Sequence, residues 1–238
     1  MKKTAFLHPM RKYESIFGWF YLVMHMFLIS VGISFLYYGV LLPNGIELTD
    51  AQLNALYYGV GFVLILLIMF RFLKASFHDL CSNKLNSFSG ITTGYVINYV
   101  LGIVVNLVVM LFLSDNMTNP NNAAVMDQVK INQNVMTAVS VLLAPIVEEV
   151  LFRGVAFGTI RKKNRLLAYI VSVFLFAVYH LLTYIIADFS FENLLYLIQY
   201  LPAGIALAYC YERSRNIWGP IFLHMLINFI AVTVTVAL

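Results

Sequence analysis

Charged residues are scarce in this chain: Asp, Glu, Lys and Arg make up 11% of its 238 residues. Soluble globular proteins carry about 25%, so the composition excludes an ordinary soluble domain. Hydrophobic residues account for 61%, and apolar runs of about 20 residues recur, each long enough to cross a bilayer. The sequence therefore predicts an all-α, polytopic bundle of transmembrane helices. Its small size and short loops suit an integral protein of a bacterial plasma membrane.

Cysteine and sequence repeats are also nearly absent. The only two cysteines are Cys81 and Cys210, and both fall at the cytoplasmic ends of apolar runs. Thiols stay reduced in that compartment, so no structural disulfide is expected. No low-complexity tract or internal repeat is detectable in the sequence. The lack of an inverted repeat argues against a secondary transporter.

The apolar runs predict about seven spans with the N-terminus inside and the C-terminus outside. The spans cover residues 16–42, 55–73, 91–113, 135–160, 166–187, 193–211 and 217–237. This orientation places 13 of the 15 lysines and arginines on the cytoplasmic side, as the positive-inside rule requires. They are Lys2, Lys3, Arg11, Lys12, Arg71, Lys74, Lys84, Arg161, Lys162, Lys163, Arg165, Arg213 and Arg215.

The acidic residues support the same orientation. The outer loops carry Glu47, Asp50, Asp115, Asp127, Asp188 and Glu192. The net charge of +4 then reflects the orientation of the chain in the membrane. We expect no nucleic-acid partner from it.

The chain divides into two parts by the chemistry of its side chains. Residues 1–134 are expected to form three spans and an outer interfacial segment, with a short helix after Asn119 that has Val125 and Val129 on one side. Residues 135–238 are expected to form a four-helix core that carries nearly all the ionisable groups at membrane depth.

Small and aromatic residues in the first part receive structural interpretations. Glycines in the first three spans predict that helices approach each other closely there. They are Gly32, Gly59, Gly61 and Gly102. Aromatic residues near span ends, Tyr57 and Tyr58 among them, are typical of the belt at a membrane interface. His25 is interpreted as a residue that hydrogen-bonds between helices.

Polar groups in three spans are predicted to meet at one depth. By the rise of an α-helix, Glu148, His180, His224 and Asn228 each lie roughly 13 to 22 Å from the basic residues that end their spans. Ionisable groups at membrane depth cost a few kcal/mol each and are functional-site candidates by default. Glu149 is the fifth such group. The shared depth of the five favours a catalytic or ion-handling centre over scattered hydrogen-bonding residues.

Spacing along each helix assigns these groups to faces. Glu149 and Arg153 are four residues apart and can neutralise each other, whereas Glu148 points about 100° away. His224 shares a face with Asn228 in the same way, and Phe176 lies four residues before His180. Pro145 precedes Glu149 by four residues and is expected to bend the helix, either opening space for water or as an ordinary membrane kink.

Three ordered motifs resemble a known family. The segment Ala144-Pro145-Ile146-Val147-Glu148-Glu149-Val150-Leu151-Phe152-Arg153-Gly154 is similar to the Glu-Glu-x-x-x-Arg signature of the CAAX-protease and bacteriocin-processing family, also called the abortive-infection family. Phe176-x-x-x-His180 resembles its second motif and His224-x-x-x-Asn228 its last. The motifs cover residues 135–238, and no motif covers the first three spans.

The resemblance implies an intramembrane endopeptidase that acts on a membrane-associated protein or peptide, of CAAX or bacteriocin type. Glu148 with His180 would activate water, and His224 with Asn228 would stabilise the oxyanion. Glu149 and Arg153 would support the helix geometry. A zinc ion held by Glu148, His180 and His224 is the alternative to a metal-free site, which we favour because no His-Glu-x-x-His pair is present.

Two questions stay open at this level. The same residues would also occur in a bacteriocin-immunity or scaffold protein that binds without cutting, and substrate and oligomeric state are not encoded in the motifs. For the cavity itself, we expect an opening towards the cytoplasm, where the rim from Arg161 to Arg165 with Arg213 and Arg215 could attract acidic groups.

Overall fold

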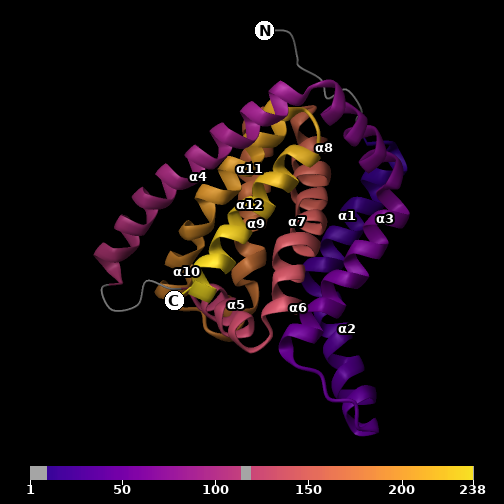
Figure 1. The fold of residues 1–238 in the computed structure, drawn as a ribbon, viewed down its shortest axis with the longest axis vertical. Coiled ribbons are helices and arrows are strands. Elements are labelled where there is room, and N and C mark those ends of the chain that lie inside the picture. Colours follow the sequence, from indigo (N-terminus) through magenta and orange to yellow (C-terminus); the bar gives the residue numbers. More distant parts are fainter. Residues whose placement is uncertain (1–9, 114–118, 238) are drawn as a thin grey trace.

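The computed structural model describes residues 10–113 and 119–237, and these are almost wholly helical, with no strand among them. Figure 1 shows how the helices are arranged in the bundle. The α-helices are α1 (Lys12–Phe27), α2 (Ile29–Leu36), α3 (Asp50–Ser82), α4 (Lys84–Phe112), α5 (Pro120–Ile131), α6 (Gln133–Thr137), α7 (Ala144–Glu149), α8 (Gly158–Arg161), α9 (Arg165–Ala187), α10 (Phe191–Tyr196), α11 (Leu201–Ser214) and α12 (Trp218–Ala237). Short π or 3-10 segments lie at Tyr37–Leu41, Leu42–Asn44, Ala138–Leu143, Val150–Phe157 and Leu197–Tyr200.

The expected all-α bundle of about seven spans is confirmed. Six helical stretches of the described chain are long and apolar enough to cross a membrane, and the bent pair Lys12–Phe27 with Ile29–Asn44 gives a seventh if its two helices form one span. That pair turns by 52°, so the first predicted span is not a straight helix. Its second half, α2, diverges from the bundle (Figure 1).

Side-chain caps explain where several helices begin. Thr49 accepts a hydrogen bond from the backbone N–H of Gln52 before α3, and Asn119 accepts one from Asn122 before α5. Asn164 and Ser190 do the same before α9 and α10. Each cap satisfies a backbone donor that the first helical turn leaves free, which sets the starting residue. The predicted short helix after Asn119 is therefore present.

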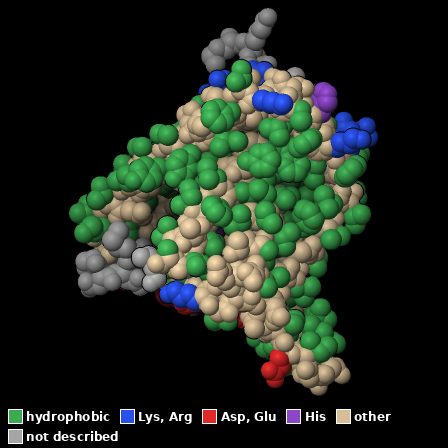
Figure 2. Space-filling view, viewed as in Figure 1, with side chains coloured by type: hydrophobic (Ala, Val, Ile, Leu, Met, Phe, Trp, Pro, Cys, Tyr) green, Lys and Arg blue, Asp and Glu red, His purple; other side chains and the backbone are tan. Residues whose placement is uncertain are grey.

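Basic side chains gather at one end of the bundle, as Figure 2 shows. We call this the basic end; its described members lie at or near the helix ends that meet there in Figure 1, and they are Arg11, Lys12, Arg71, Lys74, Lys84, Arg161, Lys162, Lys163, Arg165, Arg213 and Arg215. Glu212 forms ion pairs there with both Arg161 and Arg165, each with an N–O distance of 2.7 Å. Lys2, Lys3 and Asp115 lie outside the described residues. Assignment of the basic end to the cytoplasm stays a prediction from the positive-inside rule.

The span that carries the first motif lies in the centre of the molecule. Between Gln133 and Arg161 the helix is more buried than any other span, whereas the outer helix α4 is the least buried. Its core residues, such as Val147 and Phe152, belong to the same buried hydrophobic cluster as Leu22 of α1 and Met69 of α3. The N-terminal helices therefore form one hydrophobic core with the motif-bearing helices.

Glycines divide into those that face a neighbour and those that do not. A Cβ on Gly61 would meet Tyr21 Oη at 2.8 Å, in accord with the predicted close approach. No neighbouring atom of the described chain lies within 4 Å of a Cβ added at Gly32, Gly59 or Gly102. The interpretation of these three glycines as helix contacts is therefore wrong. The close contact in α4 is instead at Gly94, where a Cβ would meet Leu223 Cδ2 at 2.6 Å.

Wide helical turns flank the glutamates. The π-helical segments Ala138–Leu143 and Val150–Phe157 lie on either side of α7, and Pro145 is in the first turn of α7. Because proline has no N–H and crowds the preceding turn, the usual backbone bond to Val141 is lost. The residue before the proline, Ala144, donates its backbone N–H to the carbonyl oxygen of Val139, which is five residues back and not the usual four. The proline thus coincides with a local change in helix geometry next to Glu148.

Candidate active site

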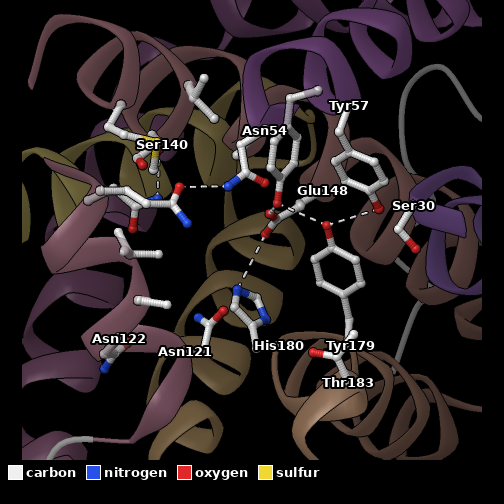
Figure 3. Close-up of a pocket in the computed structure, with 18 of the residues that line it drawn as sticks. Ser30, Asn54, Tyr57, Asn121, Asn122, Ser140, Glu148, Tyr179, His180 and Thr183 are labelled. Carbon is white, nitrogen blue, oxygen red and sulfur yellow. Dashed lines mark hydrogen bonds and ion pairs between the residues drawn. The ribbon is translucent and has the colours of Figure 1, made fainter. Parts of the chain in front are cut away.

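A cavity of about 630 Å³ contains the motif residues Glu148, His180, His224 and Asn228 in its wall. Figure 3 shows Glu148 of α7 at the centre, with labelled side chains of α3, α5 and α9 around it. The structure therefore brings together side chains from three motifs that are far apart in the sequence. The volume lies within the range of small-molecule and cofactor pockets in proteins.

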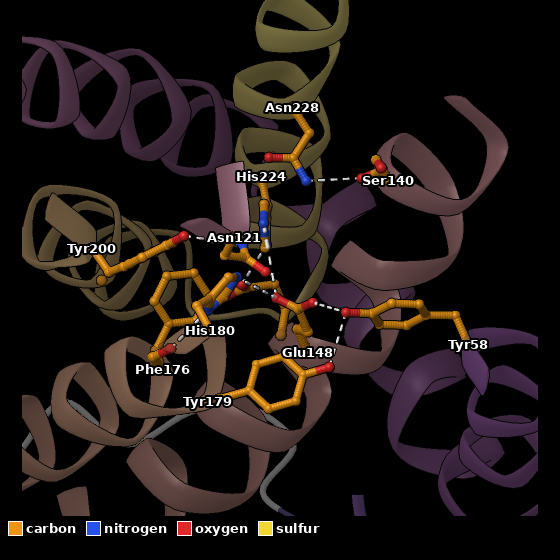
Figure 4. A network of polar contacts seen from close by, with 12 residues as sticks. Tyr58, Asn121, Ser140, Glu148, Phe176, Tyr179, His180, Tyr200, His224 and Asn228 are labelled. Atoms are coloured by element: carbon orange, nitrogen blue, oxygen red, sulfur yellow. Dashed lines mark hydrogen bonds and ion pairs between the residues drawn. The ribbon is translucent and has the colours of Figure 1, made fainter. Parts of the chain in front are cut away.

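Glu148 is buried, with 2% of its surface exposed, and its two oxygens have different surroundings. Oε1 accepts a hydrogen bond of 2.8 Å from Tyr58 Oη. Oε2 has no hydrogen-bond partner among the described residues. It lies 3.8 Å from Nε2 of His180 and 4.0 Å from Nε2 of His224. Figure 4 shows this convergence.

Both imidazoles are held through Nδ1, which leaves Nε2 directed at Glu148. His180 donates from Nδ1 to the carbonyl oxygen of Phe176 at 2.8 Å. His224 donates from Nδ1 to Oε1 of Glu149 at 2.8 Å. These acceptors fix the proton on Nδ1, so each neutral ring presents a lone pair at Nε2. Three acceptor atoms therefore face one another around Glu148 Oε2.

Glu149 forms a separate buried network. Its Oε1 accepts 2.8 Å bonds from both Arg153 Nη1 and His224 Nδ1, and Glu149 and Arg153 have no exposed surface. Arg153 also donates to the carbonyl oxygen of Gly204. The predicted pairing of Glu149 with Arg153 and the divergence of the two glutamates are confirmed. The bond from His224 to Glu149 was not predicted.

Aromatic rings hold His180 on two sides. The ring of Phe176 lies 4.5 Å from it by centroids, and the ring of Tyr200 stacks on it at the same distance. The guanidinium of Arg153 lies 4.4 Å over the Phe176 ring. Phe176 thus packs between the buried ion pair and His180, a supporting position like the one expected for it. Tyr200 had no signal in the sequence.

Asn228 lies one helical turn beyond His224 on α12. Its side-chain amide donates to the backbone carbonyl of Ser140 at 2.8 Å. The bond is visible in Figure 4, and Asn228 remains part of the cavity wall. An amide nitrogen carries two protons, so one is left for another acceptor.

The alternative of a zinc ion can be examined through the spacing of its three candidate ligands. Ligands of a tetrahedral zinc, with bonds of about 2.0–2.1 Å, lie about 3.3 Å from one another. Glu148 Oε2 is 3.8 and 4.0 Å from the two Nε2 atoms. No group of three His, Cys, Asp or Glu side chains in the described chain has a metal-binding arrangement. In this conformation Glu148, His180 and His224 do not fit a zinc ion.

The structure adds a chain of tyrosines that the sequence interpretation missed. Tyr58 Oη lies 2.9 Å from Tyr179 Oη, Tyr179 is 3.3 Å from Tyr57 Oη, and Tyr57 donates to the carbonyl oxygen of His25 at 2.7 Å. The interpretation of Tyr57 and Tyr58 as interfacial belt residues is therefore wrong. The ring of His25 stacks on Tyr57 and Tyr179 of other helices, but its Nδ1 contacts only Tyr21 of the same helix and its Nε2 has no hydrogen-bond partner among the described residues. The predicted side-chain hydrogen bond between helices is therefore wrong.

The end at which the cavity opens differs from the expectation. Its wall extends from Glu148 to Asp50, Asn122 and Gln128, which lie on or next to α3 and α5 at the opposite end from the basic residues. No lysine or arginine of the described chain lines it. The predicted opening towards the rim of Arg161 to Arg165 is wrong, because depth along a helix does not reveal at which end the helices separate.

An all-helical membrane bundle with two carboxylates, two imidazoles and an amide at one buried site has the composition of an intramembrane hydrolase. Residues 130–230 match the family model "Type II CAAX prenyl endopeptidase Rce1-like". A protein of Bacillus subtilis (strain 168) named "Putative membrane peptidase YdiL" is 31% identical over 109 residues, which is 45% of this chain and 40% of the relative. The match thus spans well under two thirds of that relative.

These matches confirm the resemblance of the three motifs to the CAAX-protease and bacteriocin-processing family of membrane proteases. Helices α1 to α4 lie outside the matched segment. No solved structure shows significant similarity to the chain.

Proposed function

We propose that the protein is an intramembrane endopeptidase that hydrolyses a peptide bond with a water molecule activated by Glu148. One observation carries this proposal: Glu148 Oε2 is buried, has no hydrogen-bond partner among the described residues, and faces two imidazole nitrogens at 3.8 and 4.0 Å. A buried carboxylate oxygen without a donor is costly unless a ligand or water supplies one.

Water suits this position because it is the missing donor. Its two protons can bond to Glu148 Oε2 and to Nε2 of His180, which lie 3.8 Å apart. In the proposed step, Glu148 takes a proton from the water as the water oxygen bonds to the carbonyl carbon of the substrate. The proton on Glu148 then passes to the amide nitrogen as the C–N bond breaks. The products are a new carboxyl group and a new amine.

His224 and Asn228 are proposed to stabilise the oxyanion that forms on the carbonyl oxygen. Asn228 has one amide proton left beyond its bond to Ser140. His224 would join it by donating from Nε2 after that nitrogen takes up a proton during the reaction, while Glu149 accepts from Nδ1 at 2.8 Å; in the resting site the ring is neutral. Donors fixed in advance by other contacts stabilise developing charge effectively, because they need not reorganise.

Glu149 and Arg153 are proposed to have a supporting role. Their 2.8 Å ion pair has no exposed surface, so Glu149 is unsuited to contact a substrate in the cavity. Its bond to His224 orients that ring towards Glu148. The two neighbouring glutamates would then serve different purposes: Glu148 in proton transfer and Glu149 in positioning.

We propose that the reaction needs no metal, because the spacing around Glu148 leaves room for water and is too wide for zinc. The proposed substrates are membrane-associated proteins or peptides, in line with the endopeptidase and peptidase descriptions of the matched family and relative. Membrane lipid surrounds the bundle.

Mass spectrometry can test the activity directly. The purified protein, reconstituted in lipid nanodiscs, would be incubated with a peptide mixture in ¹⁸O-labelled water. We expect fragments that carry ¹⁸O in their new carboxyl groups, and none of them with the Glu148→Gln variant. Peptides that bind equally to both proteins but are never cut would support the non-cleaving immunity or scaffold function instead.

A further inference from the structure

The cavity leads away from the basic end. Beyond Glu148 its wall is built by Ser30 and Ser34 of α2, Asn54 of α3, Gln128 of α5 and Thr183 of α9. Ser30, Ser34 and Thr183 are exposed, so the cavity reaches the surface between α2 and α9. In Figure 3 Ser30 lies on the side of Tyr57 and Tyr179 that faces away from Asn121 and Asn122.

The charges along this path are all negative. Asp50 lies exposed at the mouth and Glu148 lies at the inner end, while Arg153 neutralises only Glu149. Apart from the imidazoles of His180 and His224, the remaining polar groups in the wall are neutral amides and hydroxyls; they include Ser30, Ser34, Asn54, Asn121, Asn122, Gln128, Ser140, Thr183 and Asn228. Amides can bond to both the N–H and the C=O of a peptide backbone.

From these observations we infer that the substrate is an extended peptide segment with neutral or basic side chains near the cleaved bond, and that it enters from the face opposite the basic end. By the positive-inside rule this is the outer face of the membrane. The inference rests on the proposed function and adds the side of entry and the substrate class to it.

An acidic peptide fits this cavity poorly. A carboxylate drawn into it would lose water and gain no cation, because no lysine or arginine of the described chain lines the wall. The same argument applies to a free C-terminal carboxylate close to the cleaved bond. A lysine or arginine side chain would instead be attracted to Asp50. A charge at the rim of a binding site mainly raises the rate of association.

Thiol labelling tests the side of entry. Ser140→Cys in a Cys81→Ser background places a thiol in the cavity wall, and wild-type Cys81, exposed at the end of α3, is the matched reporter for the basic end. Cys210 is buried and is left unchanged.

With a membrane-impermeant maleimide, intact cells should label Ser140→Cys and leave Cys81 unreacted, and inverted vesicles should give the reverse. A second variant, Ser34→Cys, should follow Ser140→Cys because Ser34 borders the same cavity. Labelling of Ser140→Cys from the Cys81 side, or from neither side, would overturn the inference.

Peptide binding tests the substrate class independently of cleavage. Fluorescent peptides with one core sequence and either lysine or glutamate flanks would be titrated onto the Glu148→Gln variant in nanodiscs. We expect the lysine-flanked peptide to bind about 2- to 5-fold tighter, within the range for one exposed charge pair, and Asp50→Asn to remove most of that preference. Equal binding, or tighter binding of the glutamate-flanked peptide, would overturn the inference. Selective binding without cleavage by the wild type would contradict only the proposed function.

Discussion

Tyr58 Oη donates a 2.8 Å hydrogen bond to Oε1 of Glu148, and so joins α3 to the helix of the first motif. This bond leaves Oε2 to face His180 and His224. A residue outside the segment that matches the protease family therefore orients the central carboxylate of the candidate site.

Tyr58→Phe should lower kcat about 10-fold with little change in KM, since the ring remains and only the donor to Glu148 is lost. One hydrogen bond to a charged group is worth about 1.5–3 kcal/mol, which permits an effect of this size. The matched control is Tyr57→Phe, whose hydroxyl bonds to the backbone of His25 and makes no bond to Glu148. An equal loss in both variants would contradict a specific role for Tyr58.

Arg153→Ala should destabilise the protein by about 3–5 kcal/mol, because it leaves Glu149 as a buried charge without its cation. Thermal unfolding in detergent and protein abundance in membranes would measure the loss. The double variant Glu149→Gln with Arg153→Met removes both charges and should be more stable than Arg153→Ala. If it were less stable, the cost would come from packing and not from an unpaired charge.

Gly94→Val should lower the free energy of unfolding by about 1–3 kcal/mol through overpacking. A Cβ there would approach Leu223 Cδ2 at 2.6 Å and the backbone oxygen of Ala206 at 3.2 Å. Gly102→Val is the control on the same helix, because no described atom lies within 4 Å of its Cβ position. Thermal unfolding of the two variants should differ clearly; similar unfolding temperatures would argue against the packing of α4 on α11 and α12.

Hydrolysis should persist after dialysis against a strong chelator and should not rise when zinc is returned. The reason is the 3.8 and 4.0 Å spacing of Glu148 Oε2 from the two imidazoles, wider than a tetrahedral zinc requires. Metal content by mass spectrometry would accompany the rate measurement. Loss of activity that only zinc restores would show that the site contracts around a metal.

The sequence predicted the features that depend on local spacing. The apolar runs placed the spans to within a few residues at most ends, although α3 continues to Ser82. The four-residue spacing of Glu149 and Arg153 correctly predicted their ion pair. Both results follow from the geometry of a single helix, which the sequence encodes directly.

Features that depend on how helices meet were not predicted. Tyr58 looks like any aromatic residue near a span end, and only the packing of α3 against α7 brings it to Glu148, 90 positions away. The opening of the cavity depends on the bend of 52° between the first two helices and on the position of α5. Neither leaves a periodic signal in the sequence.

The separate tasks of the two glutamates are the central claim, and parallel measurement of Glu148→Gln and Glu149→Gln tests it most directly. Peptide hydrolysis and thermal unfolding would be followed for both variants in the same nanodiscs. We expect Glu148→Gln to unfold within about 2 °C of the wild type, since a ΔΔG of 1 kcal/mol shifts Tm by about 2–4 °C in a chain of this size, and to show no hydrolysis. Glu149→Gln should unfold at a clearly lower temperature because Arg153 loses its counter-charge. Hydrolysis by Glu148→Gln at the wild-type rate would contradict the account.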